Sequence, residues 1–202
     1  MLEAVLLDAQ GLGWIGPGPL GRAVAHARGF AEGPGEAPSS FADLGSGGGL
    51  PGLVLALTWP QARGVLIEGS VKRAGFLVTA VERLGLDDRC AVVAERAEAA
   101  GRRPDLRGSF DVVVARSFGP PAVTAECAAP LLHLGGRLLV SEPPTSAAPE
   151  DSRWPQAGLD LVGMVVGEAW STEFHYQSLL QNVPCPDRYP RRVGIPTKRP
   201  LF

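Results

Sequence analysis

Residues 43–52 read DLGSGGGLPG, with five glycines and one proline in ten positions. Glycine loses more backbone freedom on folding than any other residue, so this stretch is costly unless the backbone approaches something closely. The apolar run SFADL, residues 40–44, predicts a strand that leads into it. The run LPGLVLALTW, residues 50–59, predicts a helix that follows it, with proline in its first turn.

Two nucleotide-binding patterns overlap in this stretch. Residues 47–52 satisfy G-x-G-x-x-G, the dinucleotide fingerprint, whose first glycine should come directly after the strand. Residues 43–49 satisfy D-x-G-x-G-x-G, the pattern of the S-adenosylmethionine (SAM) loop. The first glycine after the strand is Gly45, which belongs to the second pattern. Position therefore favours SAM, and NAD remains the weaker alternative.

Acidic residues close two of the predicted strands. Asp43 would repel a pyrophosphate but attract the α-ammonium group of a methionine moiety. Glu68 ends the run GVLIE, where an acid accepts hydrogen bonds from both ribose hydroxyls. NAD would use the same acid, so Glu68 indicates that a nucleoside binds but does not distinguish SAM from NAD. The predicted contacts of the cofactor here are Asp43, Gly45, Gly47, Gly49 and Glu68.

The rest of the chain alternates between strand and helix patterns. Further strands are expected at 90–94, 110–115 and 135–141, with helices at 71–86 and 121–134. Two strand-like runs, 159–170 and 172–183, then follow without a helix between them, which requires an antiparallel pair. We therefore predict an α/β fold, a Rossmann-like class I SAM-dependent methyltransferase, with a mostly parallel seven-stranded sheet ending in an antiparallel hairpin.

The strand–helix pattern, the SAM loop and the distribution of charge together suggest three parts. A short N-terminal helical extension is expected over 1–38, a SAM-dependent methyltransferase domain over 39–187, and a basic tail over 188–202. A Pro/Ser-rich loop is expected at 142–158. The tail holds five basic and no acidic residues, although the whole chain has a net charge of −2. It indicates either an anionic partner or a solvated terminus.

The cysteines and the apolar runs indicate in which compartment the protein works and whether it enters a membrane. Cys90, Cys127 and Cys185 fit neither a metal-ligand pattern nor a disulfide framework, so we expect a reducing cytoplasm and no metal. No apolar run approaches the ~20 residues of a membrane helix, so no membrane association is expected.

Several segments together resemble one family. They are DLGSGGGLPG (43–52), LIEGSVKRAGFL (66–77), ERAEA (95–99), FDVVVARSF (110–118), LLHLGG (131–136) and the basic RYPRRVGIPTKRPLF (188–202). In these segments the chain resembles the RsmG (GidB) family of bacterial 16S ribosomal RNA guanine-N7 methyltransferases. The resemblance is strong over roughly residues 39–140 and extends to the basic tail.

The resemblance implies a SAM pocket built from Gly45, Leu50, Ala97, Glu98 and Arg116. The Ala97 N–H and the Glu98 carboxylate are candidates for reading the adenine edge, although Glu98 is otherwise a solvated helix acid. Arg116 is expected to contact the methionine carboxylate or the target base, or else to form an ion pair at the end of the sheet.

The implied substrate is 16S ribosomal RNA or the small ribosomal subunit, with S-adenosylhomocysteine as product. Guanine N7 carries a lone pair and no proton, so no catalytic base is expected. Phe118 is a candidate to stack on a flipped base, or else a core residue; Trp154 is an alternative platform. The tail residues Arg191, Arg192 and Lys198 are expected to hold phosphates, leaving SAM affinity nearly independent of the tail.

Three departures from the family pattern keep other acceptors open. The N-terminal segment is short, the overall charge is acidic, and Glu142 stands where a cation is expected after the fifth strand. They favour, as an alternative, a methyltransferase for a small molecule or a protein. A non-catalytic RNA-binding protein with a relict pocket is a further alternative, against which the intact set of Asp43, the loop glycines and Glu68 counts.

Overall fold

A computed structural model describes residues 1–143 and 153–202, so part of the expected 142–158 loop lies outside the described residues. Its centre is a seven-stranded sheet of order β3-β2-β1-β4-β5-β7-β6. β1 to β5 are parallel, and β7 is antiparallel to both neighbours, which confirms the predicted fold. The strands are β1 (Ser40–Leu44), β2 (Arg63–Ile67), β3 (Cys90–Val93), β4 (Phe110–Ala115), β5 (Leu132–Glu142), β6 (Met164–Ser171) and β7 (His175–Gln181).

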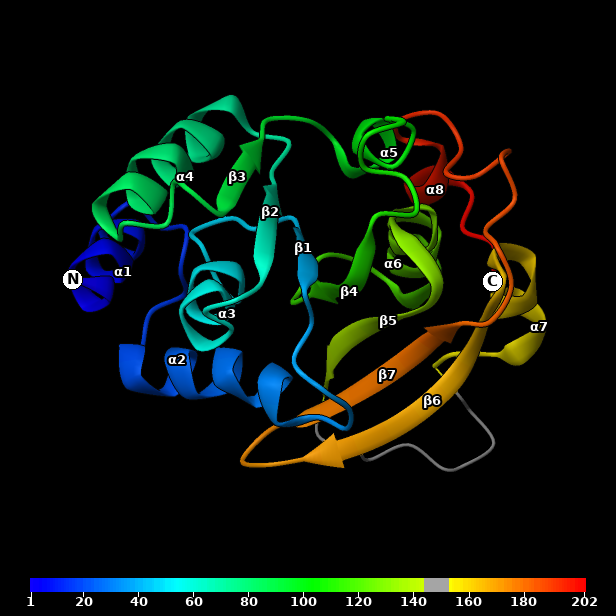
Figure 1. Ribbon diagram of the computed structural model, residues 1–202, viewed down its shortest axis with the longest axis horizontal. Helices are drawn as coiled ribbons and strands as arrows, with labels where there is room; N and C mark the ends of the chain where they lie inside the picture. Colours follow the sequence, from blue (N-terminus) through cyan, green and yellow to red (C-terminus); the bar gives the residue numbers. More distant parts are fainter. Residues whose placement is uncertain (144–152) are drawn as a thin grey trace.

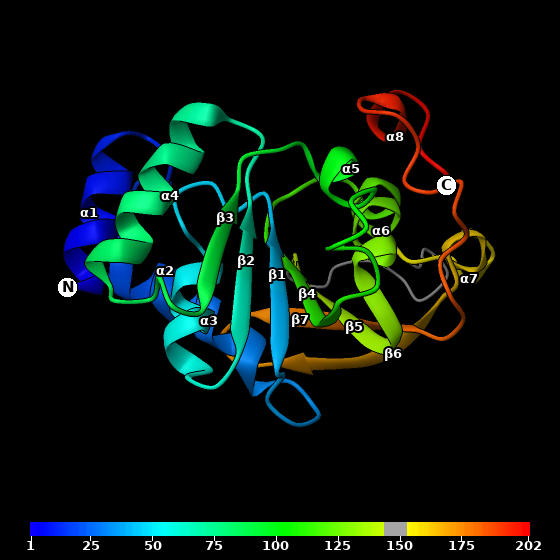
Figure 2. The same cartoon turned by 45° about the horizontal axis from the view of Figure 1, so that its top comes forward.

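Helices cover both faces of the sheet (Figures 1 and 2). Side chains alternate along β4, so Val112 and Val114 pack with α3 and α4 while Val113 and Ala115 pack with α5, α6 and α7. A strand buried on both faces in this way is apolar throughout. The helices are α1 (Leu2–Gly11), α2 (Leu20–Arg28), α3 (Gly52–Thr58), α4 (Val71–Arg83), α5 (Ala97–Ala100), α6 (Pro121–Ala128), α7 (Gln156–Leu159) and α8 (Ile195–Lys198).

Several element boundaries differ from the sequence expectation, and three of them have a clear backbone cause. The helix predicted over 121–134 ends at Ala128, since Pro130 has no N–H to continue it, and β5 begins at Leu132. The strand predicted from residue 159 begins at Met164, after a 3₁₀ turn that ends at Gly163 with φ +79°. α4 ends at Arg83 rather than residue 86, two residues before Gly85, whose φ is +63°. Left-handed glycines commonly follow helix ends.

The N-terminal segment packs against the glycine-rich turn between β1 and α3. A Cβ placed on Gly48 would lie 2.8 Å from Ile15 Cγ1 and 3.2 Å from the Ala9 Cβ. Only glycine permits this approach, so the turn is enclosed from outside by residues that precede the sheet. In the part of the chain that the structure describes, no helix is both long and apolar enough to cross a membrane.

Candidate active site at the carboxyl edge of the sheet

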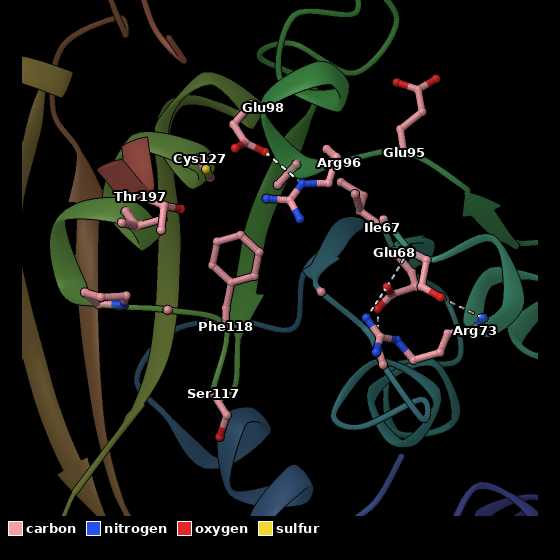
Figure 3. A pocket seen from close by; sticks show the side chains of 18 residues that line it. Ile67, Glu68, Arg73, Glu95, Arg96, Glu98, Ser117, Phe118, Cys127 and Thr197 are labelled. Carbon is pink, nitrogen blue, oxygen red and sulfur yellow. Dashed lines mark hydrogen bonds and ion pairs between the residues drawn. The ribbon is translucent and has the colours of Figure 1, made fainter. Parts of the chain in front are cut away.

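A cavity of about 520 Å³ opens at the carboxyl ends of the parallel strands. Gly45 and Glu68 line it after β1 and β2, Ala97 after β3, and Phe118 after β4. Figure 3 shows Glu68 and Arg73 on one side and Phe118, Cys127 and Thr197 across from them. Ligands of open α/β sheets bind at this edge.

The glycine turn gives the cavity its backbone wall. Gly45, Gly47 and Gly49 all have positive φ, at +68°, +56° and +98°, which L side chains rarely adopt. Gly45 and Gly47 line the cavity, and a Cβ on Gly45 would lie 2.7 Å from Phe118 Cδ2. Gly49 instead faces the core, where a Cβ would clash with Leu53 Cδ1. The first two glycines therefore lie beside the cavity and the third supports the turn.

Glu68 joins the turn to the start of α4. Its carboxylate accepts hydrogen bonds from Gly47 N at 2.9 Å, Ser70 N at 2.7 Å and Arg73 Nη2 at 2.7 Å. Burial acts to raise the pKa of Glu68, but these hydrogen bonds outweigh it and hold the pKa below its ordinary value. The acid is fixed as a hydrogen-bond acceptor at the position predicted for a ribose.

Asp43 lies beneath the turn rather than in the cavity wall. It is fully buried, and its Oδ2 accepts a hydrogen bond from Gly52 N at 3.0 Å, in the first turn of α3. Oδ1 has no hydrogen-bond partner among the described residues. Burial raises the pKa of Asp43 to about 7. The structure thus gives Asp43 a role in holding α3, and its contact with an α-ammonium group remains a prediction.

The β3 end of the cavity is closed by the C-terminal tail. Ala97 and Glu98 line the cavity in α5, and Glu98 Oε1 accepts a hydrogen bond from Gly194 N at 2.9 Å. Thr197, in α8, lines the same cavity. α8 lies beside α5 and α6 in both views of the fold (Figures 1 and 2).

A buried ion pair fixes this tail to α6. Arg191 Nε and Nη2 donate to the two carboxylate oxygens of the fully buried Glu126, at 2.8 and 2.6 Å. The guanidinium predicted to hold a phosphate is therefore engaged by a carboxylate of the protein itself. Arg192 and Lys198 are exposed and line none of the described cavities, so they remain candidates for phosphate contacts. Because Thr197 lines the cavity, the structure predicts that SAM affinity depends on the tail, which differs from the sequence expectation.

Arg116 lines a neighbouring cavity of about 270 Å³, together with Leu50 and the N-terminal residues Trp14 and Ile15. It makes no hydrogen bond or ion pair with another described residue, and burial lowers its pKa. An unpaired, half-buried guanidinium is suited to a carboxylate or phosphate. The sequence allowed, as the other role of Arg116, an ion pair at the end of the sheet. Arg116 forms no such ion pair with any described residue.

A third cavity, of about 400 Å³, adjoins the first beside Phe118. Among the described residues, Ser117 alone lines all three cavities. Its φ is +53°, and non-glycine residues with positive φ concentrate at functional sites. Phe118 lies between the first and third cavities and also packs against the core, so both of its predicted roles are compatible with its position. Trp154 is buried in the core, where its Nε1 donates to Glu142.

Sequence patterns missed three features of this site. They did not pair Glu126 with Arg191, did not place Thr197 in the cavity wall, and did not give Ser117 its left-handed backbone. The sequence shows the basic RYPRR run and the acid Glu126, but nothing in it pairs Glu126 with Arg191, because 65 residues separate them. In the described ranges, 1–143 and 153–202, no three His, Cys, Asp or Glu side chains gather as a metal ion requires.

Comparisons with known proteins agree with this geometry. The GidB family model, described as rRNA small subunit methyltransferase G, matches residues 30–146. Ribosomal RNA small subunit methyltransferase G of Roseiflexus castenholzii is 40% identical over 175 residues, covering 83% of this chain and 73% of that protein. The protein of the same name from Prochlorococcus marinus strain MIT 9313 is 37% identical over 171 residues, covering 81% and 68%.

Two solved structures share the fold. A putative O-methyltransferase from Klebsiella pneumoniae superposes with a TM-score of 0.61 at 12% identity, covering 90% of each chain. Cofactor-bound Rv0187 from MTB gives 0.60 at 18% identity, covering 90% of this chain and 89% of that one. The glycine turn without Cβ atoms and the acid at the end of β2 fit SAM. The chain belongs to the GidB family, rRNA small subunit methyltransferase G, and is a SAM-dependent methyltransferase.

Proposed function

We propose that this enzyme methylates N7 of a guanine in 16S ribosomal RNA, either free or in the small ribosomal subunit. The observation that carries the proposal is the meeting of two cavities at Ser117 and Phe118. The first cavity contains the glycine turn and Glu68, which fit the cofactor. The third cavity, which adjoins it after β4, is where an acceptor base would lie. The names of the relatives, which are ribosomal RNA methyltransferases, supply the class of acceptor.

The roles proposed for the cofactor residues follow their positions. Glu68 would bind the ribose hydroxyls, and Ala97 with Glu98 the adenine. Gly45 and Gly47 would let the methionine moiety lie against the backbone, and Leu50 would pack beside it. Arg116 would hold a carboxylate or a phosphate. Asp43 and Gly49 would support the turn from below.

Bound SAM supplies an electrophilic methyl group. Guanine N7 has a lone pair and no proton, so the protein need not remove one, and orientation is its main contribution. Orientation of this kind supplies up to ~7–11 kcal/mol of a barrier. Phe118 would position the base, since flipped bases are held against aromatic side chains. The exposed Arg192 and Lys198 would contact phosphates of the RNA.

The test is methyl transfer from labelled SAM to three acceptors: deproteinised 16S RNA, small ribosomal subunits and a metabolite extract. The RNA is then digested and its nucleosides identified. Labelled 7-methylguanosine in either RNA sample is the expected result, and mapping its position gives the target guanine. Label found only in the metabolite extract would overturn the proposal and favour a small-molecule acceptor.

A further inference from the structure

His26, in the N-terminal helix α2, lines the third cavity together with Phe118 and Arg153. This cavity adjoins the first one at Ser117 and Phe118, where the acceptor base is proposed to lie. His26 does not line the cofactor cavity. Its imidazole is therefore placed to contact the acceptor rather than the cofactor.

The protein fixes the ring of His26 without using the ring nitrogens. The imidazole packs face to face on Phe174, in the turn between β6 and β7, with 4.3 Å between the ring centroids and 17° between the planes. The backbone carbonyl of His26 accepts a hydrogen bond from Tyr176 OH at 2.7 Å, which joins α2 to β7. Neither ring nitrogen has a hydrogen-bond partner among the described residues. Packing thus orients the ring and leaves its polar edge available.

The other polar side chains of this cavity are mostly engaged by the protein itself. Glu142 accepts from Trp154 Nε1 and pairs with Arg153. Thr124 Oγ1 donates to a carbonyl oxygen at the start of its own helix. Apart from serine hydroxyls, His26 is the polar side chain of this cavity without a partner among the residues that the structure describes. A half-buried polar group without a partner is suited to a ligand that supplies one.

The imidazole of His26 is neutral at ordinary pH. Burial, together with the charges of Arg116 and Arg22, lowers the pKa of His26 to about 4. A neutral imidazole offers one N–H donor and one lone pair. Methyl transfer to N7 moves the positive charge of the sulfonium onto the base. A neutral group can contact that base before and after the transfer without repelling it.

We propose that His26 binds the target nucleotide: a nitrogen of its imidazole hydrogen-bonds to the nucleotide in the third cavity and orients the base toward the methyl group. The inference rests on the proposed function, and it gives the N-terminal segment a direct part in acceptor binding. A group that is held in place before the substrate arrives reduces the entropy lost in orienting that substrate.

The test compares three variants in methyl transfer to the target RNA. His26→Phe keeps a flat ring on Phe174 but has no nitrogen, so kcat/KM should fall roughly threefold to tenfold for one lost neutral hydrogen bond. His26→Asn and His26→Gln lose the stacked ring but place an amide near Nδ1 or Nε2. At least one of these two should be more active than His26→Phe, although both should be less stable. If His26→Phe is as active as the wild type, His26 only packs and the inference is overturned.

Two controls separate acceptor binding from other effects. His175→Phe removes an imidazole that lines none of the described cavities, so it should keep the wild-type kcat/KM. The Kd for S-adenosylhomocysteine should be the same in His26→Phe as in the wild type, because His26 does not line the cofactor cavity. A higher Kd in His26→Phe would assign its effect to the cofactor site and overturn the inference.

A measurement on the wild type decides if the His26 variants fail to fold. NMR records the ring nitrogens of isotopically labelled histidine in the complex with S-adenosylhomocysteine. The signals of His26 are identified by elimination, with His133→Gln and His175→Phe. Adding a 16S RNA fragment that contains the mapped target should shift a ring-nitrogen signal of His26, as a new hydrogen bond requires. An unchanged signal in the RNA-bound complex overturns the inference.

The remaining outcomes distinguish the inference from the proposed function. If the wild type forms 7-methylguanosine and His26→Phe does so equally well, the role of His26 is overturned and the function stands. A wild-type enzyme that methylates no guanine in either RNA sample overturns both.

Discussion

The carboxylate of Glu68, just after β2, accepts a hydrogen bond at 2.9 Å from the amide of Gly47, in the turn after β1. Arg73 Nη2 holds the other oxygen at 2.7 Å. One buried acid thereby fixes the turn of one strand to the helix that follows the next (Figure 3). The shape of the cavity therefore depends on the side chain that we propose as the acceptor of the ribose hydroxyls.

Glu68→Gln should weaken cofactor binding. The amide keeps one acceptor oxygen but loses the charge that faces Arg73, and hydrogen bonds to charged groups contribute ~1.5–3 kcal/mol each. We expect the Kd for S-adenosylhomocysteine, measured by calorimetry, to rise roughly tenfold to a hundredfold. Glu82→Gln, at an exposed position of α4, should leave the Kd unchanged. If Glu68→Gln folds and its affinity is unaltered, the ribose hydroxyls do not bind to this acid.

Gly45→Ala should damage both the fold and the cavity. Its φ of +68° costs an L-residue about 1–2 kcal/mol, and the added Cβ would lie 2.7 Å from Phe118 Cδ2. The free energy of unfolding should therefore fall, and S-adenosylhomocysteine should no longer bind measurably. Adding Phe118→Ala removes the clash but not the backbone strain, so affinity should recover only in part.

Gly75→Ala is the matched control for Gly45→Ala. A Cβ at Gly75, within α4, meets no heavy atom within 4 Å. Alanine is favoured over glycine in helices by about 1 kcal/mol, so this variant should be as stable as the wild type or slightly more so in urea denaturation. A comparable loss of binding in both variants would contradict the role given to Gly45.

Stability without cofactor should fall as the pH rises from about 4 to about 7, through Asp43. Burial raises its pKa from 3.8 to about 7, so in that interval the folded protein holds a proton that the unfolded chain releases. The three-unit shift corresponds to about 4 kcal/mol at most. Urea denaturation at pH 5, 6 and 7 should show this slope in the wild type and in the exposed Asp87→Asn. Between pH 5 and 7 the stability of Asp43→Asn should fall by about 2 kcal/mol less than that of the wild type, which is the part of the shift that lies in this range. Identical slopes would refute the assignment.

Arg191→Ala should destabilise the protein and weaken cofactor binding together. Removing the guanidinium leaves the fully buried Glu126 unpaired, which costs about 3–5 kcal/mol in comparable buried pairs. The segment it anchors carries Gly194, which donates to Glu98, and Thr197, which lines the cavity. We expect a lower melting temperature and a higher Kd for S-adenosylhomocysteine. A wild-type Kd in the folded variant would separate the tail from the cofactor site.

Arg192→Ala, one residue along, should have the opposite profile. Its side chain is exposed, so stability should change by no more than ~0.5 kcal/mol and cofactor affinity should be unaffected. Binding to 16S RNA should weaken, and the slope of log K against log salt should decrease in magnitude by about 1 if one phosphate contact is lost. A salt slope equal to that of the wild type would exclude Arg192 from the RNA surface.

Local sequence determined the parts of this protein that depend on backbone chemistry and periodicity. The glycines after Leu44 permit the positive φ values of the turn, and alternation of apolar runs with helical stripes specified the parallel strands. Because the carboxyl ends of parallel strands meet at one edge, Glu68 and Ala97 were predicted to lie near the glycine turn, as they do. Element ends were less certain, as the early end of α6 before Pro130 illustrates.

Tertiary structure alone decided which charges are available to a ligand and which are used by the fold. Arg191 and Arg192 are adjacent and chemically alike, yet one is bound to a buried carboxylate 65 residues away and the other faces solvent. Likewise, Asp43 lies under the turn and Glu142 lines a cavity, although both end a strand. No local pattern encodes these differences, because pairing between distant side chains depends on how helices pack on the sheet, which is settled only when the whole core forms.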